Sequence, residues 1–382
     1  MRIAVFSTAR VPSRTANSIQ VLKVCQALQD LGHSVRLWLP GAVPAEAWND
    51  LAARYGVPGP IDIDWCGGIS PLRRYDYALR SFLRARAWGV ELCYAWPLQS
   101  AALTSILGLP TVLELHELPQ GRFGPGLFRA FLRGHGARRL LPITASLRDQ
   151  AAAIYPIPDS PDLVHVAPMG VDLDRYRDLP GPSEARRRLG WPETLTVGYT
   201  GHLYAGRGIE LLLKLALLRP GLRFVVVGGE PEAAEHWRQE ARATGVANLE
   251  FLGFVANADL PRYQSACDVL VMPSQRHIAG SSGGDIGSVA SPMKVFEYLA
   301  AGRAILASDL PVFREVLSET NAVLAPPDDA DAWALALDDL SARPDHRKRL
   351  GERARRDAAQ YSWQERARRS LEGIDPGRRP DG

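Results

Sequence analysis

The sequence predicts an α/β protein in which two open parallel sheets are each covered by helices. Short apolar runs alternate with amphipathic stretches along the whole chain, which is the pattern of repeated βα units. This pattern pauses at residues 173–195, a stretch rich in proline, glycine and charge that we interpret as a linker, and then restarts. A chain of 382 residues is long for one core, so we expect two domains.

Strand and helix candidates occur in both halves of the chain. Apolar residues at helical spacing in residues 19–32 predict a first helix that stops at Gly32. We assign residues 1–175 to an N-terminal domain and residues 176–360 to a C-terminal domain. The strand candidates are the apolar runs at residues 2–7, 34–40, 92–96, 111–116, 140–146, 195–201, 223–229, 249–254, 269–274 and 304–308.

The end of the chain is polar and is expected to lie apart from both sheets. Residues 352–374 predict a surface helix. Within residues 361–382 we expect this helix to cross back towards the N-terminal domain, before a flexible tail. Ligands of open parallel sheets bind beyond the carboxyl ends of the strands, so the cleft between the two domains is the expected active site.

The composition is that of an ordinary globular enzyme, with 46% hydrophobic and 23% charged residues. No apolar run reaches the roughly 18–20 residues of a membrane span. The N-terminal residues lack a secretory signal, so we expect a cytoplasmic protein. A net charge of +3 does not indicate a nucleic-acid partner, and four cysteines without a CxxC pair favour buried reduced thiols over a metal site or disulfides.

The loop after the strand candidate at residues 195–201 has the composition of a phosphate site. Gly201, Gly206 and Gly208 let backbone N–H groups approach a ligand closely, and Arg207 stands just before a predicted helix. Free N–H groups, a helix dipole and a guanidinium together suit a diphosphate. The loop matches neither the P-loop nor the GxGxxG pattern, and the alternative is an ordinary βα turn with an exposed arginine.

Two further strand ends favour the same kind of ligand. Gly229 ends a buried apolar run, where a backbone can approach a ligand closely. The run at residues 249–254 ends in a Gly–Phe–Val turn, whose backbone could bond a base edge while Phe254 or Val255 packs on it.

A helix candidate in residues 288–309 carries one acid and one lysine among apolar neighbours. Ser291 can cap this helix, Pro292 fits its first position, and Gly302 can end it. Glu297 and Lys294 both lie near its start, where they would meet a ligand.

The order of these motifs resembles the family 4 glycosyltransferases of the GT-B fold. The motifs are RIAVFS, LGHSVRLWLP, PTVLELHE, VAPMGVDLDRY, GYTGHL, GRGI, VVVGG, FLGFV, LPRYQSACDVLVMPS and SPMKVFEYLAAGRAILASD. The resemblance runs from residue 1 to about residue 365. It implies two Rossmann-like domains facing a central cleft, and retaining transfer from a nucleotide-diphosphate sugar without a metal ion or other cofactor.

The resemblance assigns roles to residues of the C-terminal half. The arginine and lysine that clamp the diphosphate in this family fall on His202 and Arg207. Of the family's two acids, spaced E-x7-E, Glu297 matches the one that binds the ribose hydroxyls. Val289 occupies the position of the other, which touches the sugar ring, so the chain resembles a variant with the signature SPxKxFEY.

Other groups of the same loop are candidates for binding the donor. The backbone at Ser291, Pro292 and Met293 can face the diphosphate, and Lys294 can reach the phosphate or the sugar. Asp285, Lys294 or the backbone of residues 281–287 could replace the missing acid near the sugar.

In the N-terminal half, His116 matches a histidine that contacts the donor sugar near the reacting carbon; the alternative is a structural histidine at a strand end. Asn17 and Ser18 can cap the first helix and face the acceptor or the sugar. His116, Arg207 and Lys294 are thus the catalytic candidates.

The expected reaction is sugar transfer from a UDP- or GDP-linked donor to a hydroxyl of a glycan, lipid or small-molecule acceptor. The alternatives are a non-catalytic GT-B protein that binds a sugar nucleotide or a partner, and a nucleotide-sugar epimerase, which would need more carboxylates. Arginine-rich stretches at residues 70–89 and 127–141 could bring the protein to the inner face of an anionic membrane, or pack on the sheet as ordinary helices.

Overall fold

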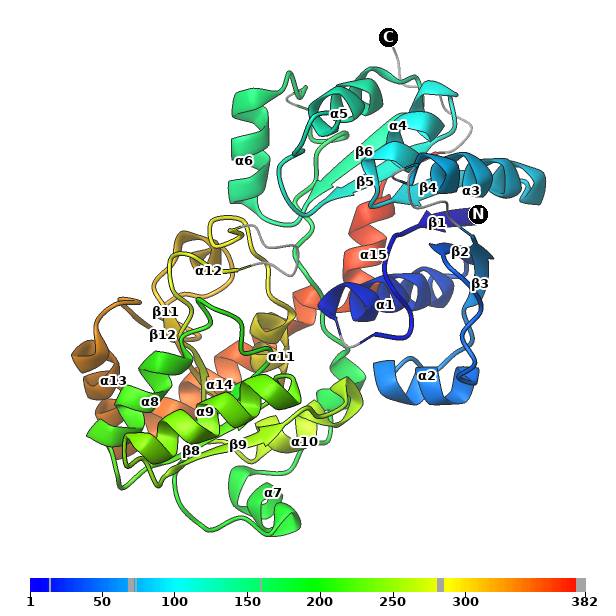
Figure 1. Ribbon diagram of the computed structural model, residues 1–382. Coiled ribbons are helices and arrows are strands. Elements are labelled where there is room, and N and C mark those ends of the chain that lie inside the picture. Colours follow the sequence, from blue (N-terminus) through cyan, green and yellow to red (C-terminus); the bar gives the residue numbers. More distant parts are fainter. Residues whose placement is uncertain (14, 68–71, 73, 159, 280–284, 376–382) are drawn as a thin grey trace. The chain divides into compact units, whose positions relative to one another are not determined.

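Figure 1 shows the computed structural model, which describes all residues except 14, 68–71, 73, 159, 280–284 and 376–382. The chain divides into two compact units. Unit 1 comprises Met1–Met169 together with the chain from Trp363, and unit 2 comprises Gly170–Ser362. Each unit is built on a six-stranded parallel sheet, which confirms the predicted fold class.

Unit 1 has the strand order β3-β2-β1-β4-β5-β6, and every neighbouring pair is parallel. Its strands are β1 (Arg2–Phe6), β2 (Ser34–Pro40), β3 (Asp62–Cys66), β4 (Leu92–Ala95), β5 (Thr111–Leu115) and β6 (Ala137–Pro142). Its helices are α1 (Ala16–Asp30), α2 (Trp48–Tyr55), α3 (Tyr75–Trp88), α4 (Leu98–Ile106), α5 (Gly124–Arg133), α6 (Ala145–Ile154) and α15 (Trp363–Leu371). Helices α1 and α15 pack against each other (Figure 1).

Unit 2 has the order β12-β11-β10-β7-β8-β9, again with parallel neighbours. Its strands are β7 (Thr196–Thr200), β8 (Arg223–Val227), β9 (Leu249–Gly253), β10 (Val269–Met272), β11 (Ala304–Ser308) and β12 (Val323–Ala325). Its α-helices are α7 (Pro182–Leu189), α8 (Ile209–Leu218), α9 (Pro231–Ala243), α10 (Leu260–Ser265), α11 (Met293–Ala301), α12 (Pro311–Arg314), α13 (Ala330–Ala342) and α14 (Pro344–Ala358). Its 3₁₀ turns are η2 (Leu173–Tyr176), η3 (Asn257–Asp259) and η4 (Ala359–Tyr361).

The two sheets share one topology when their strands are counted from the first. In each unit the first strand lies beside the fourth, while the second and third follow on its other side. The strand order therefore reverses between β1 and β4 and between β7 and β10. Ligands of open α/β sheets bind at such a reversal, beyond the carboxyl ends of the strands.

The central strands are buried on both faces. All five residues of β11 are buried, as are all five of β7 and β5. This explains why these strands appear in the sequence as continuous apolar runs instead of alternating patterns. The four cysteines are free and buried in the two units, as predicted.

Two edge strands were missed in the sequence. The sequence of β3, DIDWC, mixes polar and apolar residues, and Asp62 is exposed. Among the described strands, β3 pairs with β2 alone. β12 has three residues, which are too few for a recognisable pattern. Both strands lie at sheet edges, where a continuous apolar run is not required.

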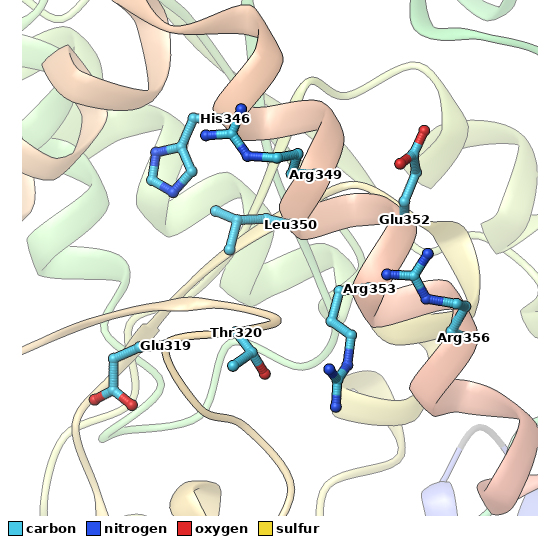
Figure 2. Close-up of a pocket in the computed structure, with 8 residues that line it drawn as sticks. All are labelled: Glu319, Thr320, His346, Arg349, Leu350, Glu352, Arg353 and Arg356. Atoms are coloured by element: carbon cyan, nitrogen blue, oxygen red, sulfur yellow. The ribbon is translucent and has the colours of Figure 1, made fainter.

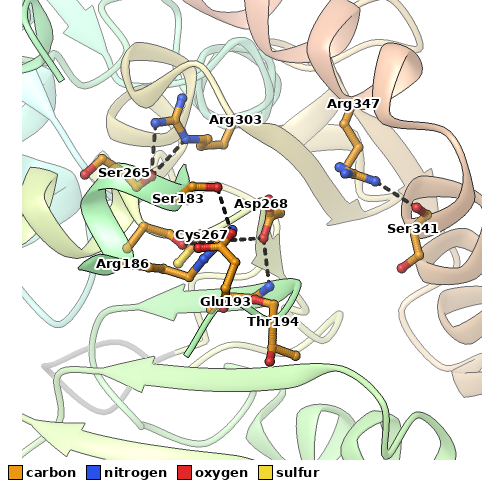
Figure 3. A network of polar contacts seen from close by, with 12 residues as sticks. Ser183, Arg186, Glu193, Thr194, Ser265, Cys267, Asp268, Arg303, Ser341 and Arg347 are labelled. Atoms are coloured by element: carbon orange, nitrogen blue, oxygen red, sulfur yellow. Dashed lines mark hydrogen bonds and ion pairs between the residues drawn. The ribbon is translucent and has the colours of Figure 1, made fainter. Parts of the chain in front are cut away.

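The predicted linker at residues 173–195 is wrong, because this segment folds as part of unit 2. It contains η2 and α7, and Arg186 of α7 is buried. Arg186 forms ion pairs with Glu193 and, at 2.7 Å, with Asp268 (Figure 3). Asp268 also accepts a hydrogen bond from the backbone of Thr196 at 2.9 Å, so the network holds α7 to the start of β7.

The predicted surface helix at residues 352–374 is also wrong. Helix α14 ends at Ala358 in unit 2, and α15 begins at Trp363 in unit 1. Helix α15 buries the side chains of Trp363 and Arg366. The sequence placed the unit boundaries at residues 175 and 360, whereas the structure divides the chain after residues 169 and 362. The predicted flexible tail at 376–382 lies outside the described residues.

Candidate functional site

The loop between β7 and α8 leaves the sheet of unit 2 at its topological reversal. Its backbone has positive φ at Gly201 (138°), Gly206 (81°) and Gly208 (78°), which favours glycine. A Cβ at Gly206 would lie 2.0 Å from the carbonyl oxygen of His277, and one at Gly208 would lie 1.7 Å from that of Pro273. Glycines are therefore required where this loop passes the loop that follows β10.

Lys294, in the first turn of α11, reaches this same loop. Its Nζ lies 3.8 Å from the centroid of the Tyr199 ring, and a Cβ at Gly201 would lie 2.7 Å from it. Burial lowers the pKa of Lys294 well below its usual range; Arg207 lowers it further, and Glu297 acts in the opposite sense. Within the described part of the chain, the Lys294 ammonium has no hydrogen-bonding or ion-pair partner. An anion bound here would stabilise its charged form.

Arg207 lies one residue before Gly208, the N-cap residue of α8. Its side chain is half-buried, and its Nε is buried without a hydrogen-bond partner among the described residues. A buried polar atom left unpaired is unfavourable, and so is the nearness of the two cations Arg207 and Lys294. A bound diphosphate would relieve both effects.

His202 is a neutral part of this loop near pH 7. Burial lowers the pKa of His202 below its usual 6.5, and the charges of Lys294 and Arg207 lower it further. Its ring stacks on Tyr204 at a centroid distance of 4.9 Å, and its carbonyl accepts a hydrogen bond from the Tyr199 hydroxyl at 2.7 Å. His202 therefore does not supply the charge of the arginine expected at this position, whereas Lys294 places a cation against the same loop.

Glu297 is held in a fixed orientation on α11, with only 8% of its surface exposed. The side-chain amide of Asn257 donates to Oε1 at 3.2 Å, and that of Gln264 approaches Oε2 at 3.5 Å. Arg175 in turn donates to Asn257 at 2.8 Å, and the Tyr176 hydroxyl donates to Gln264 at 2.9 Å. No ion pair to Glu297 occurs among the described residues, so its carboxylate is available to neutral hydroxyl groups of a ligand.

The three other strand-end candidates follow β8, which lies beside β7, and β9, which lies beside β8. A Cβ at Gly229 (φ 85°) would lie 2.5 Å from a methyl carbon of Leu203 in the β7–α8 loop. Phe254 is 40% exposed and Val255 is half-buried. These residues share one edge of the sheet with the β7–α8 loop, as predicted for a bound nucleotide.

Helix α11 begins one residue later than predicted. Met293 is its first residue, Pro292 occupies the N-cap position with extended backbone (φ −69°, ψ 130°), and Ser291 lies before it. The side chain of Pro292 makes no cap hydrogen bond, and the N–H of Val295 donates to the Pro292 carbonyl at 3.1 Å. Gly302 ends the helix in the left-handed conformation, as predicted. The preceding glycine-rich segment at 280–284 lies outside the described residues.

Asp285 stabilises its own loop. Its carboxylate accepts hydrogen bonds from the backbone N–H groups of Ile278 and Gly287 at 3.0 and 2.9 Å, and it lies 2.7 Å from Nδ1 of His277. The His277 bond and the backbone bonds lower the pKa of Asp285 to about 2. Val289, where an acid was expected, is buried, so an apolar side chain fills that position.

In unit 1, His116 follows the end of β5. Its Nε2 lies 2.7 Å from Oε1 of Glu114 and 3.2 Å from both the indole nitrogen of Trp96 and the amide nitrogen of Gln20. The His116 side chain is nevertheless 30% exposed. The ring is thus anchored by the protein and accessible to a ligand.

Asn17 and Ser18 do not cap α1. The helix begins at Ala16 with Thr15 at its N-cap, so both residues lie in its first turn. Asn17 is exposed there. Ser18 is fully buried and donates to the Thr15 carbonyl at 2.8 Å, with its hydroxyl 2.9 Å from that of Ser13. Asn17 is accessible to a ligand, whereas Ser18 stabilises the helix start.

A separate polar pocket of about 370 Å³ lies beside α14 in unit 2 (Figure 2). None of the predicted site residues lines it. Its acidic and basic side chains are mostly exposed, and we assign it no role. The lining residues are Glu319, Thr320, His346, Arg349, Leu350, Glu352, Arg353 and Arg356. Among the described residues, no group of three or more His, Cys, Asp or Glu side chains could hold a metal ion.

Two family descriptions match the chain: "Glycosyltransferase Family 4" at residues 18–175 and "Glycosyl transferases group 1" at residues 183–357. The chain belongs to the family 4 glycosyltransferases. This glycosyltransferase is 29% identical over 366 residues to the phosphatidyl-myo-inositol mannosyltransferase of Mycolicibacterium smegmatis, covering 90% of this chain and 85% of the relative. It is 31% identical to the D-inositol 3-phosphate glycosyltransferase of Saccharomonospora viridis, where the match covers 59% of this chain and 53% of the relative.

Solved structures confirm the GT-B fold of this glycosyltransferase. Anabaena Alr3699/HepE in complex with UDP and glucose superposes with a TM-score of 0.73, covering 97% of this chain and 99% of that one. Its sequence identity is 16%, so the likeness concerns the fold.

The sequence did not indicate the residues that support the site. Gln264 lies within the motif LPRYQSACDVLVMPS and Asn257 lies three residues before it, but neither was a candidate, although both orient Glu297. Tyr199 lies within the recognised GYTG stretch, but its contact with Lys294 arises only because α11 packs beyond the end of β7.

Proposed function

We propose that this glycosyltransferase moves a sugar from a nucleotide-diphosphate sugar to an acceptor hydroxyl with retention of the anomeric configuration. The main support is the cation pair beyond β7, in which Arg207 has an unpaired buried Nε and the ammonium of Lys294 lies against Gly201. A diphosphate supplies the charge and the hydrogen-bond acceptors that this pair lacks. A solved relative in fold, named for its complex with UDP and glucose, supports the same class of donor.

The rest of the donor would extend along the carboxyl edge of the sheet in unit 2. The oriented carboxylate of Glu297 would accept hydrogen bonds from both ribose hydroxyls, since a carboxylate has two oxygens for a vicinal diol. Phe254 and Val255 would pack on the base, whose edge would meet the backbone of the same turn. These contacts suit a uridine or a guanosine diphosphate sugar.

In the proposed reaction, the bond between the sugar and the phosphate loosens towards an oxocarbenium-like state. Negative charge then grows on the departing diphosphate, where Arg207, Lys294 and the N-terminus of α11 stabilise it. The acceptor hydroxyl enters on the face from which the diphosphate leaves, and a leaving phosphate oxygen takes its proton. His116 would contact the sugar near the reacting carbon. Because two side-chain cations meet the leaving charge, we propose that no metal ion is needed.

The direct test is a screen for release of nucleoside diphosphate from UDP- and GDP-linked sugars, with and without EDTA. We expect one donor to be turned over at the same rate in both conditions. Nucleotide binding without any release of diphosphate would instead favour the non-catalytic alternative.

Glu297→Ala is expected to raise KM for the donor by at least about 10- to 100-fold, because each hydrogen bond to a charged group contributes about 1.5–3 kcal/mol. The matched control is Glu352→Ala, which removes an exposed glutamate of α14 paired with Lys348 at 3.9 Å. Steady-state kinetics with varied donor would check this, and equal KM values in the two variants would contradict the ribose contact.

Helix α3 supports a membrane-associated acceptor. Tyr75, Leu79 and Leu83 are 42%, 50% and 55% exposed and, at spacings of four, share one face of the helix. Tyr77 and Phe82 belong to the buried face of the same helix. We propose that this exposed row, beside exposed arginines, contacts anionic lipid. Residues 70, 71 and 73 of this stretch lie outside the described residues.

The second arginine-rich stretch, at residues 127–141, contains the end of α5 and most of the strand β6. Phe128 and Phe131 of α5 are fully buried. No helix among the described residues has the length and apolar character of a membrane span. The relative from M. smegmatis is named for a phosphatidyl-myo-inositol acceptor, and a lipid or polyol hydroxyl is accordingly the first acceptor to test.

Replacing Leu79 and Leu83 by aspartate is expected to lower binding to vesicles of phosphatidylglycerol by at least about tenfold, because two apolar side chains lose their contact with the bilayer. Co-sedimentation with anionic and neutral vesicles measures this effect. Leu335→Asp is the control, since Leu335 is a 66% exposed leucine of unit 2. A wild-type protein that stays in the supernatant with anionic vesicles would refute the membrane contact.

A further inference from the structure

Glu114 is a buried carboxylate on β5 that the reaction above does not use. Its side chain has no exposed surface, and its Oε1 lies 2.8 Å from Nη2 of Arg366. The Tyr94 hydroxyl and the Gln20 amide also donate to it. Burial alone raises the pKa of Glu114, but Arg366 and the hydrogen bond with His116 outweigh burial and bring this pKa down to about 2. The group is therefore ionised at working pH.

The Glu114 carboxylate favours one tautomer of the His116 ring. Glu114 and His116 are two residues apart, so both side chains leave β5 on the same face. A protonated Nε2 can donate a charge-assisted hydrogen bond to Oε1 across the observed 2.7 Å. The neutral indole of Trp96 at 3.2 Å would favour the opposite form, with Nε2 as acceptor, but its bond is weaker. No described residue hydrogen-bonds Nδ1, which is left for a ligand.

The counter-ion of Glu114 comes from the last helix of the chain. Arg366 of α15 is buried, and its Nε donates to the Pro168 carbonyl at 2.8 Å. Its Nη2 donates to the Ala167 carbonyl at 3.2 Å, and its Nη1 to the Tyr94 hydroxyl at 3.3 Å. The guanidinium is thus fixed by backbone as well as by the carboxylate.

We propose that Glu114 is a positioning residue, which holds the His116 ring with Nε2 protonated and Nδ1 free for the ligand, and that Arg366 keeps this carboxylate ionised in the interior. The inference rests on the proposed role of His116 in sugar transfer. It also gives α15 a part in the reaction that a purely structural helix would not have.

The chain offers a matched control for the structural role of α15. Arg139 of β6 is also buried and also holds this helix, since its Nη1 donates to the carbonyls of Arg369 and Ser370 at 3.2 and 3.3 Å. It makes no contact with His116 or Glu114 among the described hydrogen bonds and ion pairs. Arg139→Met therefore loosens α15 without altering the surroundings of the imidazole.

The first measurement is kinetic. Glu114→Gln is expected to lower kcat by about 10- to 100-fold, the usual effect of removing a carboxylate that orients a histidine, with KM for the donor changed by less than about threefold. Because this variant leaves Arg366 buried without its partner, the double variant Glu114→Leu with Arg366→Met is measured beside it. Removing both charges of a buried pair is often neutral for stability. We expect the same loss of kcat in the double variant and near wild-type kcat in Arg139→Met.

The second measurement reads the ring directly and does not depend on activity. Protein labelled with ¹⁵N-histidine gives two-bond ¹H–¹⁵N correlations that distinguish the two tautomers, and His116→Ala assigns the signal among the eight histidines. We expect protonated Nε2 in the wild type and in Arg139→Met. In the double variant the ring is expected to change to protonated Nδ1, because Trp96 and Gln20 then donate to Nε2.

The outcomes separate this inference from the proposed function. An unchanged tautomer in the double variant, or a loss of kcat that Arg139→Met shares, overturns the positioning role. Loss of activity in His116→Ala but in neither Glu114 variant overturns it as well. Full activity in His116→Ala overturns the role of His116 in transfer, and the tautomer measurement then decides whether Glu114 holds the ring.

Discussion

Arg207→Ala is expected to lower kcat/KM for the nucleotide-sugar donor by about 10²- to 10³-fold, the usual effect of removing one donor that stabilises transition-state charge. The guanidinium stands at the end of the β7–α8 loop with its Nε buried and unpaired. In the proposed reaction it meets the negative charge that grows on the departing diphosphate. The charge of Arg207 also lowers the pKa of Lys294. Removal of Arg207 leaves Lys294 as the one side chain of this pair that can meet the diphosphate.

The control for this variant lies at the other end of the same helix. Arg219, the C-cap residue of α8, forms an ion pair with Asp338 at the surface of unit 2. Arg219→Ala removes one positive charge from the same unit, and its turnover is expected to stay within about twofold of the wild type, because exposed ion pairs contribute little. Steady-state kinetics with varied donor compares the two. Equal values of kcat/KM for Arg207→Ala and Arg219→Ala would remove Arg207 from the diphosphate site.

Arg186→Met is expected to destabilise unit 2 by about 3–5 kcal/mol, which is the usual effect of removing one partner of a buried ion pair. Arg186 is 4% exposed and donates to the Ala266 carbonyl at 3.1 Å, besides pairing with Asp268. Without it, the mostly buried Asp268 keeps, among the described hydrogen bonds and ion pairs, only the bond from the Thr196 N–H. Urea denaturation of the full chain measures the change as a lower midpoint for the transition of unit 2.

Arg187→Met is the matched comparison, because Arg187 is the next residue of α7 and is exposed. Its effect is expected to stay within about 0.5 kcal/mol, as for most surface substitutions. A midpoint for Arg186→Met equal to that of Arg187→Met would show that the network in Figure 3 does not stabilise unit 2.

The sequence predicted those parts of the fold and the site that depend on local chemistry. Buried strands such as β7 and β11 appear as apolar runs because both of their faces are covered. The glycines of the β7–α8 loop were recognised as residues that let the backbone approach a ligand closely, and Gly206 and Gly208 also pass the next loop where a Cβ would not fit. Gly302 correctly predicted the end of α11, because glycine readily adopts the left-handed conformation found there.

The features that the sequence did not reveal depend on contacts between distant segments. The stretch at residues 173–195 was interpreted as a linker because it is charged, yet Arg186 is buried and pairs with Glu193 of the same stretch and with Asp268 from a distant segment. The charged helix α15 was expected at the surface, yet Arg366 of this helix is paired with the buried Glu114 of β5. Composition predicts exposure for an arginine, and only the tertiary structure supplies the partner that permits burial.

The missing acid of the family pattern illustrates the same limit. Val289 fills that position with a buried apolar side chain, and Asp285 is bound within its own loop. The sequence offered Asp285 and Lys294 as possible replacements, and only Lys294 has an ionisable group against the phosphate loop. Which sugar is accepted should therefore depend on a cation in this glycosyltransferase.

We propose that the cations of unit 2 stabilise the leaving diphosphate during retaining transfer from a nucleotide-diphosphate sugar. The most direct measurement is ¹H NMR of the first product formed from an α-linked UDP- or GDP-sugar and an acceptor, with EDTA present. We expect release of the nucleoside diphosphate and a new glycosidic bond of α configuration. A β-linked product, or an absolute need for a divalent metal ion, would contradict it.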